Sequence, residues 1–319
     1  METRRLGNSG LYPSVVGFGA WAAGRNGWGN VEEKEIRLAI DKAVDLGITF
    51  FDTAPVYGFG ESERVLGQAL KAVRDKVLIA TKCGLVWDDR YEIDIDLSGE
   101  SIIREVNDSL RRLDTDYIDL YQVHWPDSKG TVPVEETFSA LNELVQAGKI
   151  RSIGVSNFSV HQLVAAQSVA PIVSLQSPYN LLQRQVEYAE LPYSEKQQLG
   201  FIPYSPLAQG LLTGKFNALT KFPDNDIRSY GNPLYKRDQF EGNVLKVELL
   251  QGIAKSIGKP LGQVAINWLL YNKAVTTVIA GAKTAAQVQE NAAASRWKLS
   301  REDYEQISRL FEPDSSYVI

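Results

Sequence analysis

Four side chains whose types suit acid–base chemistry each follow a short apolar run that could form a strand. They are Asp52, Tyr57, Lys82 and His124. Free tyrosine has a pKa of about 10, so it is a weak acid at neutral pH. A lysine ammonium beside it would stabilise the phenolate and lower that pKa, and a carboxylate would hold the lysine charged and in place. Such a tyrosine could protonate a carbonyl oxygen while hydride reaches the carbonyl carbon, and a histidine could orient that oxygen.

Each of these residues has a plainer interpretation when it is taken alone. An aspartate at a strand end usually caps a helix, a lysine can form a structural ion pair, and a histidine beside a tryptophan is usually buried and hydrogen-bonded. The functional interpretation is favoured because all four types fall at neighbouring strand ends. Cys83 follows Lys82 directly. Strand alternation turns Cys83 to the opposite face, so we expect it to fill the core.

The elements that would position these side chains alternate along the chain. Apolar, β-branched runs predict eight strands, at 15–18, 49–51, 77–81, 117–123, 150–155, 172–176, 201–204 and 275–279. Helical periodicity covers 33–46 and 102–113, and further helices are predicted to begin near 61, 134, 160, 187 and 284. This alternation fits an α/β fold of the (β/α)₈ TIM-barrel type, in which active sites lie where the strands end.

Other segments would be additions to that barrel. Residues 4–6 and 11–12 could pair as an N-terminal β-hairpin that plugs one barrel end. Two helical patterns, 244–257 and 261–271, precede the last strand, so one is predicted to be an extra helix. Residues 207–238 are rich in Gly, Pro and Asn, which is typical of a functional loop. No linker divides the chain, so we expect a single domain over residues 1–319.

The composition excludes several classes of protein. The chain has 319 residues, of which 44% are hydrophobic and 23% charged, as in ordinary globular proteins. Its net charge of −5 argues against nucleic acid as a partner. One cysteine and two histidines predict neither a disulfide nor a metal site. Residues 1–10 lack an apolar run after their arginines, and no stretch is long enough to span a bilayer, so we expect a cytoplasmic protein without a membrane partner.

Two segments are candidates for holding a dinucleotide. Residues 17–22 fit the pattern GxGxxA, but a loop follows them instead of a helix, so a Rossmann turn is not predicted. The better phosphate candidate is 281–284, at the end of the last strand. Thr284 could cap the next helix, whose N-terminus would attract an anion, and Lys283 adds a full charge. The alternative is an ordinary capped helix.

Three motifs together resemble the aldo-keto reductase family. They are Gly47–Ala54 followed by Tyr57, Gly58 and Glu61; Ile153–Phe158; and Tyr204–Leu207. The continuation 58–63 is similar to the bacterial and plant branches near the potassium-channel β-subunits. The resemblance implies a barrel that uses NADP(H) to interconvert carbonyls and alcohols. It assigns the catalytic tetrad to Asp52, Tyr57, Lys82 and His124, with Tyr57 as the acid.

The resemblance also implies a cofactor site along the strand ends. Tyr204 would stack on the nicotinamide, and Ser156, Asn157 and Gln176 would bind its carboxamide. The residues implied along the pyrophosphate and adenosine are Ser205, Pro206, Leu207, Ala208, Gln209, Lys215, Arg228, Gly281, Lys283, Thr284, Gln287, Glu290 and Asn291. The remaining cofactor residues are Gly19, Ala20, Trp21 and Asp52. NADP is favoured over NAD because Lys283 can pair with the additional phosphate.

The expected substrate is a small-molecule carbonyl compound. Its pocket would be lined by Trp21, Trp28, Tyr57, His124 and Trp125, although either of the first two tryptophans could instead be packed core. The predicted function is NADP(H)-dependent reduction of an aldehyde or ketone. One alternative is an NADP-sensing interaction module that resembles the channel β-subunits. Another is a cofactor-free isomerase or lyase with Lys82 as a Schiff base, which leaves the 204–207 and 281–283 motifs unexplained.

Overall fold

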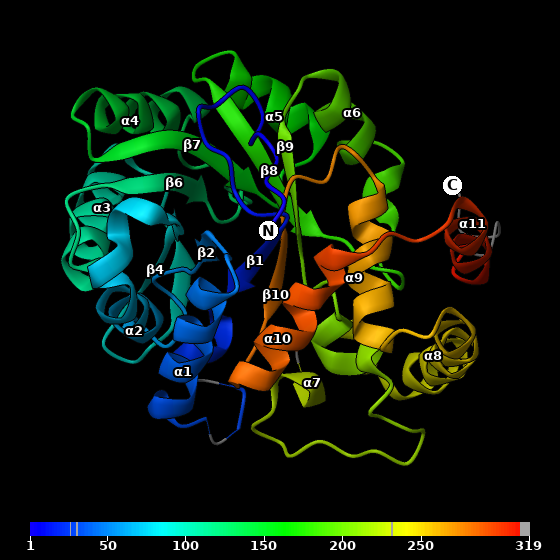
Figure 1. Cartoon of the computed structure of the whole chain (residues 1–319). Helices are drawn as coiled ribbons and strands as arrows, with labels where there is room; N and C mark the ends of the chain where they lie inside the picture. Colours follow the sequence, from blue (N-terminus) through cyan, green and yellow to red (C-terminus); the bar gives the residue numbers. More distant parts are fainter. Residues whose placement is uncertain (26, 30, 231, 313–319) are drawn as a thin grey trace.

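The computed structural model describes residues 1–312 apart from Asn26, Asn30 and Gly231. Within these residues, eight parallel strands are hydrogen-bonded in the order β10-β1-β2-β3-β6-β7-β8-β9 and curve into a barrel (Figure 1). They are β1 (Val16–Gly19), β2 (Phe50–Asp52), β3 (Leu78–Cys83), β6 (Ile118–Val123), β7 (Ile150–Ser156), β8 (Ile172–Pro178), β9 (Gly200–Tyr204) and β10 (Val278–Gly281). The predicted (β/α)₈ TIM barrel is confirmed.

The barrel closes between β9 and β10 by sparse pairing. A single bridge joins Phe201 to Val275, and the Thr276 amide donates to the Phe201 carbonyl at 2.9 Å. Regular pairing with β1 begins only at Val278. The predicted strand 275–279 was therefore placed too early, and the observed strand ends at Gly281.

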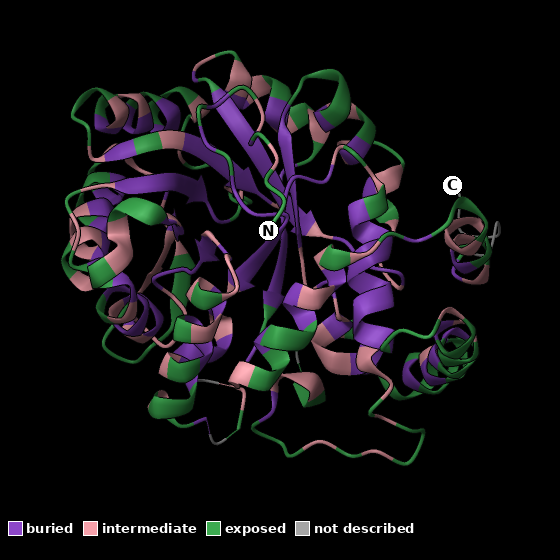
Figure 2. Cartoon of the chain, viewed as in Figure 1, coloured by how far each residue is buried: buried purple, intermediate pink, exposed green. Residues whose placement is uncertain are grey.

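Eight helices of the described chain surround the barrel and bury their inner faces against it (Figure 2). They are α1 (Glu33–Asp45), α2 (Glu61–Leu70), α3 (Gly99–Leu113), α4 (Val134–Gln146), α5 (Val160–Gln167), α6 (Glu190–Lys196), α9 (Leu261–Tyr271) and α10 (Ala285–Ala293). Side-chain caps define where several of these helices begin. The Ser98 hydroxyl accepts from the Ser101 amide before α3, and Ser159 and Gln162 form a capping box at α5.

Further elements lie outside the repeating pattern. The predicted extra helix corresponds to α8 (Arg237–Ile257), which begins seven residues earlier than its apolar periodicity indicated. The short α7 (Ile227–Tyr230) precedes it, and α11 (Arg301–Leu310) packs beside α8 (Figure 1). An antiparallel hairpin, β4 (Leu85–Trp87) and β5 (Ile93–Ile95), follows β3. Neither α11 nor this hairpin was predicted. In the part of the chain that the structure describes, no helix combines the length and apolarity that a membrane crossing needs.

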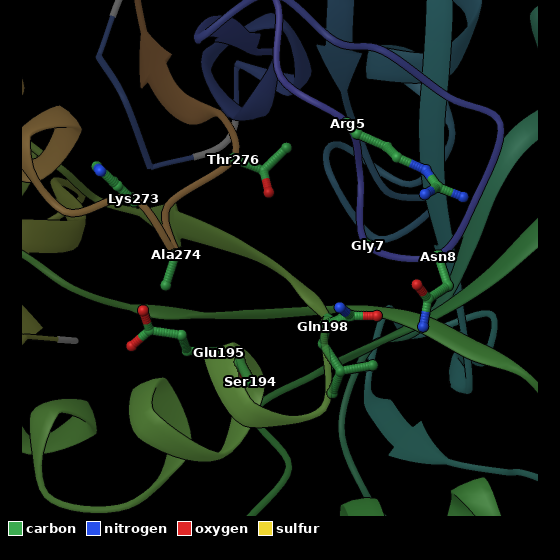
Figure 3. A pocket seen from close by; sticks show the side chains of 10 residues that line it. Arg5, Gly7, Asn8, Ser194, Glu195, Gln198, Lys273, Ala274 and Thr276 are labelled. Carbon is green, nitrogen blue, oxygen red and sulfur yellow. The ribbon is translucent and has the colours of Figure 1, made fainter.

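The N-terminal segment closes the barrel end at which the strands begin. The Leu6 amide donates to the Leu11 carbonyl at 2.9 Å, and Leu6 and Leu11 pack with Phe50 and Leu120 of the barrel interior. This confirms the plug, although its backbone pairing is too short to form regular strands. A pocket of about 300 Å³ lies beside the plug, between Gly7, the turn after α6 and residues 273–276 (Figure 3). It is at the barrel end opposite the four candidate catalytic side chains.

Candidate active site

Asp52, Lys82 and Tyr57 meet at the end of the barrel where the strands finish. Lys82 Nζ donates to Asp52 Oδ1 at 2.7 Å and to the Thr53 carbonyl at 2.9 Å, and it lies 3.5 Å from Tyr57 Oη. The Lys82 and Asp52 side chains are only 1% and 3% exposed. They meet because β2 and β3 are parallel neighbours, so their carboxyl ends lie at the same rim. The structure thus brings together the groups that the sequence placed at adjacent strand ends.

The protonation states of these groups follow from burial and from their charges. Burial raises the pKa of Tyr57, the charge of Lys82 offsets part of that rise, and the net pKa stays above its ordinary value. The lowering by lysine that the sequence predicted is therefore present, but desolvation of the phenolate is the larger effect. Burial is the largest single influence and would lower the pKa of Lys82, but Asp52 and Tyr57 together outweigh it, so the net pKa is raised. The pair presents a protonated phenol beside a charged ammonium.

Aromatic rings enclose the Tyr57 ring. His124 approaches it edge to face at 5.9 Å between ring centroids, and Trp21 stacks on it at 5.7 Å. Burial, together with the Lys82 charge, holds the pKa of His124 well below its usual range, so its imidazole is neutral. Trp28 meets Trp21 edge to face at 5.2 Å, and among the described residues its buried Nε1 has no hydrogen-bond partner. Trp125 is 44% exposed.

The backbone that carries Tyr57 is held by a close approach of two glycines. A Cβ at Gly24 would lie 2.5 Å from the Tyr57 carbonyl carbon, and a Cβ at Gly58 would clash with the Gly24 backbone. Gly58 also has a φ of +65°, which side chains other than glycine rarely adopt. The first loop and the Tyr57 loop therefore touch backbone to backbone.

Two buried glutamines complete the environment of Asp52. Its Oδ2 accepts from Gln176 Nε2 at 2.8 Å and from Gln122 Nε2 at 3.2 Å. Gln176 was expected at the site, whereas Gln122 was missed by sequence reasoning. The available signal was strand alternation, because Leu120 of the same strand also faces the barrel interior.

A second chain of contacts joins the ends of β6, β7 and β9. Tyr204 Oη donates to Asn157 Oδ1 at 2.9 Å. Asn157 Nδ2 in turn donates to the His124 carbonyl at 3.0 Å and to Ser156 Oγ at 3.1 Å. Asn157 has a φ of +63°, a strained conformation that these contacts hold. Three of the four residues expected near a nicotinamide, Tyr204, Asn157 and Ser156, are thus linked to the loop of His124.

Three cations from distant parts of the chain gather at the same rim. Burial lowers the pKa values of Lys215 and Lys283, and the charge of Arg228 lowers both further. Lys283 Nζ donates to the Trp28 carbonyl at 2.5 Å, and Arg228 pairs with Asp226 at 2.7 Å. Cations that lower one another's pKa lie near one another, and a further anion among them would relieve their repulsion as Asp226 does for Arg228.

The backbone after β9 is strained where the resemblance implied pyrophosphate contacts. Ser205, Ala208 and Gln209 have φ values of +52°, +46° and +53°, and Gly210 follows at +99°. Such conformations cost free energy and concentrate at functional sites. Gln209 Oε1 is buried and has no partner among the described residues. The loop therefore combines a strained backbone with one buried acceptor that has no partner among the described residues.

The remaining expected cofactor residues lie at the ends of β1 and β10. Gly19 is paired with both Asp52 and Gly281, and the Ala20 amide donates to the Asp52 carbonyl at 2.8 Å. Thr284 caps α10 as predicted, accepting from the Gln287 amide at 3.3 Å. The side chain of Gln287 accepts from the Lys283 amide at 2.7 Å, and Asn291 Nδ2 donates to the Gly281 carbonyl at 3.3 Å. Glu290 is exposed, and Pro206 and Leu207 belong to the strained loop.

A buried carboxyl group supports the strand that carries Lys82. Glu105 on α3 accepts from the Gly84 amide at 3.0 Å, and burial raises its pKa to about 8. The folded protein therefore holds this proton up to about pH 8, while the unfolded chain releases it near its ordinary pKa. The tighter binding of this proton by the folded protein stabilises the fold. Its full contribution to the free energy of unfolding is present below the ordinary pKa of glutamate and is lost as the pH rises toward 8.

We expect Glu105→Gln to remove this pH dependence. The amide can still accept from Gly84, but it cannot ionise in the core. The free energy of unfolding of wild type should fall as the pH rises from 5 to 8.5, and that of the variant should not. The difference between them should therefore grow by roughly 2–4 kcal/mol over this range, by the linkage between proton binding and stability. Urea unfolding at several pH values measures this. A difference between the two proteins that does not change with pH would contradict the assignment.

Comparisons with known proteins show which family this chain resembles. The profile of the Aldo/keto reductase family matches residues 15–312. The chain is 39% identical to aldo-keto reductase YhdN of Bacillus subtilis (strain 168) over 98% of its length and 94% of that protein. It is 36% identical to a probable voltage-gated potassium channel subunit beta of Oryza sativa subsp. japonica, over 91% and 90% of the two chains. The glycerol dehydrogenase AKR11B4 structure from Gluconobacter oxydans superposes with a TM-score of 0.90 at 36% identity, over 100% and 99% of the chains.

The chain therefore belongs to the aldo/keto reductase family. It is an oxidoreductase built on a (β/α)₈ barrel, and its candidate active site lies at the strand ends.

Proposed function

We propose that this protein is an NADP(H)-dependent reductase of aldehydes and ketones, with Tyr57 as the general acid. The observation that carries the proposal is the contact between the protonated Tyr57 hydroxyl and the buried, charged Lys82, beside a neutral imidazole. These groups supply a proton, a counter-charge for the phenolate and a donor for the carbonyl oxygen. Family membership supports the reaction class.

The residues at the rim suit a nicotinamide dinucleotide. Lys215, Arg228 and Lys283 leave a net positive charge for its phosphates, since only Arg228 is paired with the Asp226 carboxylate. Gln209 Oε1, which has no partner among the described residues, adds a hydrogen-bond acceptor on the strained loop after β9. At the other end, Tyr204 is held by Asn157 near His124, where an aromatic ring could stack.

Each residue of the tetrad has a distinct task in this proposal. When bound, the nicotinamide would supply the hydride that adds to the carbonyl carbon. Tyr57 gives its proton to the carbonyl oxygen, and Lys82 stabilises the phenolate that remains. Asp52 keeps Lys82 charged and oriented, and the neutral His124 donates a hydrogen bond that positions the oxygen. The phenolate regains its proton from solvent after the alcohol leaves, and the reverse sequence oxidises an alcohol.

The similarity to a probable channel β-subunit supports a second candidate function. In that role the protein would bind the oxidised cofactor tightly, turn over slowly and present its redox state to a partner. Turnover of a simple aromatic aldehyde separates the two candidates. Robust reduction supports the enzyme, and retention of NADP⁺ with negligible turnover supports the sensor.

Fluorescence titration with NADPH and NADH, followed by a panel of carbonyl compounds, tests the proposed function. We expect Lys283→Met to raise the Kd of NADPH by about 10- to 100-fold, the usual effect of losing a charged hydrogen bond, and to change the Kd of NADH much less. Lys259→Met is the matched control, since Lys259 lies over the Trp297 ring as Lys283 lies over the Trp28 ring, at 5.5 Å and 5.3 Å. Equal weakening of both cofactors would show that Lys283 does not distinguish them.

A further inference from the structure

Gln122 lies within the barrel, one residue before the last residue of β6, and is fully buried. In the strand register it faces Lys82 of β3 on one side and Gly154 of β7 on the other. A Cβ at position 154 would come within 3.1 Å of Gln122 Cγ and 2.5 Å of Ser174 Oγ. Gly154 therefore leaves the space through which the Gln122 side chain reaches the centre of the site.

The amide of Gln122 closes a triangle of hydrogen bonds with Asp52 and Gln176. Gln122 Nε2 donates to Asp52 Oδ2 at 3.2 Å, and Gln122 Oε1 accepts from Gln176 Nε2 at 3.2 Å. Gln176 Nε2 also donates to Asp52 Oδ2 at 2.8 Å. The other carboxylate oxygen, Oδ1, accepts from Lys82. Both oxygens of the buried carboxylate are thus held by donors on three other strands, β3, β6 and β8.

The charge of Asp52 dictates which way both amides point. A carboxylate oxygen repels a carbonyl oxygen at hydrogen-bond distance, so Gln176 and Gln122 must both turn their NH₂ groups toward it. Gln176 then donates its two amide hydrogens to Asp52 and Gln122. Among the described residues its Oε1 has no hydrogen-bond partner, so only an acceptor remains for a ligand.

We propose that Gln122 is a positioning residue that orients Asp52 toward Lys82 and fixes the Gln176 amide so that it offers its carbonyl oxygen to the amide hydrogens of the nicotinamide carboxamide. This inference rests on the proposed function, because it assumes a nicotinamide cofactor. Gln122 itself contacts neither the cofactor nor the substrate. It acts through the two residues that it holds.

Two substitutions of similar size separate this role from simple packing. Gln122→Met fills the same space without hydrogen bonds, and Gln122→Glu restores them only when its carboxyl is protonated. The ionisable groups around the position are Asp52 and Lys82, with Tyr57 and His124 beyond Lys82. Burial and the Asp52 charge favour the protonated form of the new glutamate at low pH. At high pH two carboxylates would repel each other and turn Asp52 away.

The experiment is a fluorescence titration of NADPH between pH 6 and 8.5, with each variant compared with wild type at the same pH. We expect Gln122→Met to raise the Kd by about tenfold at every pH. Gln122→Glu should bind within about threefold of wild type at pH 6 and about tenfold more weakly at pH 8.5. The matched controls are Gln167→Met and Gln167→Glu, because the Gln167 amide accepts from Tyr193 at 2.6 Å in the outer helical ring. These controls should follow wild type throughout.

The outcomes distinguish the inference from the proposed function. Binding by wild type, with both Gln122 variants within twofold of it at every pH, would overturn the inference alone. Equal weakening of Gln122→Glu at all pH values would also overturn it, since that result indicates packing alone. If Gln122→Met fails to fold, the pH dependence of Gln122→Glu still decides. A wild-type chain that binds neither NADPH nor NADH would overturn the proposed function and this inference with it.

Discussion

Tyr57→Phe should lower the turnover of a carbonyl substrate by about 10²- to 10⁴-fold, the usual contribution of a positioned general acid. The substitution removes one hydroxyl whose contact with Lys82 is 3.5 Å long, and it keeps the ring that packs between Trp21 and His124. The Kd of NADPH should therefore stay within about threefold of wild type, since the phenol is not expected to bind the phosphates. Steady-state kinetics and fluorescence titration on the same preparation measure both quantities.

Tyr193→Phe is the matched control for that result. Its hydroxyl also makes one hydrogen bond, to Gln167 at 2.6 Å, but it belongs to α6 on the outside of the barrel. The control should retain wild-type turnover. If Tyr57→Phe retained it as well, another group would have to deliver the proton, and the assignment of Tyr57 would be wrong.

Lys82→Met should both abolish measurable turnover and destabilise the fold. The substitution leaves the Asp52 carboxylate buried without its cation, and removing one partner of a buried ion pair costs about 3–5 kcal/mol. Because Gln122 and Gln176 still donate to Asp52, the loss should fall near the lower end of that range. Urea unfolding at pH 7 measures the change in the free energy of unfolding.

The double variant Asp52→Asn/Lys82→Met distinguishes the two effects. Once the charge at position 52 is removed, no ion remains unpaired, and most of the lost stability should return. Turnover should not return, since the ammonium that stabilises the phenolate is still missing. A double variant that is no more stable than Lys82→Met would show that the stability does not depend on the ion pair.

The periodic spacing of apolar residues predicted most of the strands and helices of this protein. Eight apolar runs separated by helical stretches were enough for the barrel, and the ends of three runs placed Asp52, Lys82 and His124 at one rim. Boundaries were less certain where tertiary pairing decides them. The last strand begins at Val278 instead of 275 because the preceding residues meet β9 at one bridge only.

Features that depend on three-dimensional packing could not be read from the sequence. The net pKa of Tyr57 depends on how far burial removes water from its hydroxyl, and the spacing of residues along the chain does not reveal that burial. The hairpin of β4 and β5 has only three residues in each strand, too few for a periodic pattern. Gln122 was not selected because a glutamine in a strand has no chemical signature of its own. Strand alternation turns its side chain into the barrel, but its contacts with Asp52 and Gln176 are needed to show what it does there.

The contact between Gly24 and Gly58 limits how this active site can change during evolution. A side chain at either position would displace the backbone of Tyr57. Substitutions there would therefore move the proton donor, and few of them can be tolerated. Differences in substrate range must therefore accumulate elsewhere, in segments that can vary without moving the acid. The hairpin of β4 and β5 touches the Tyr57 loop only through rings that pack on Phe59, and exchanging the hairpin between homologues should alter selectivity while the chemical step is retained.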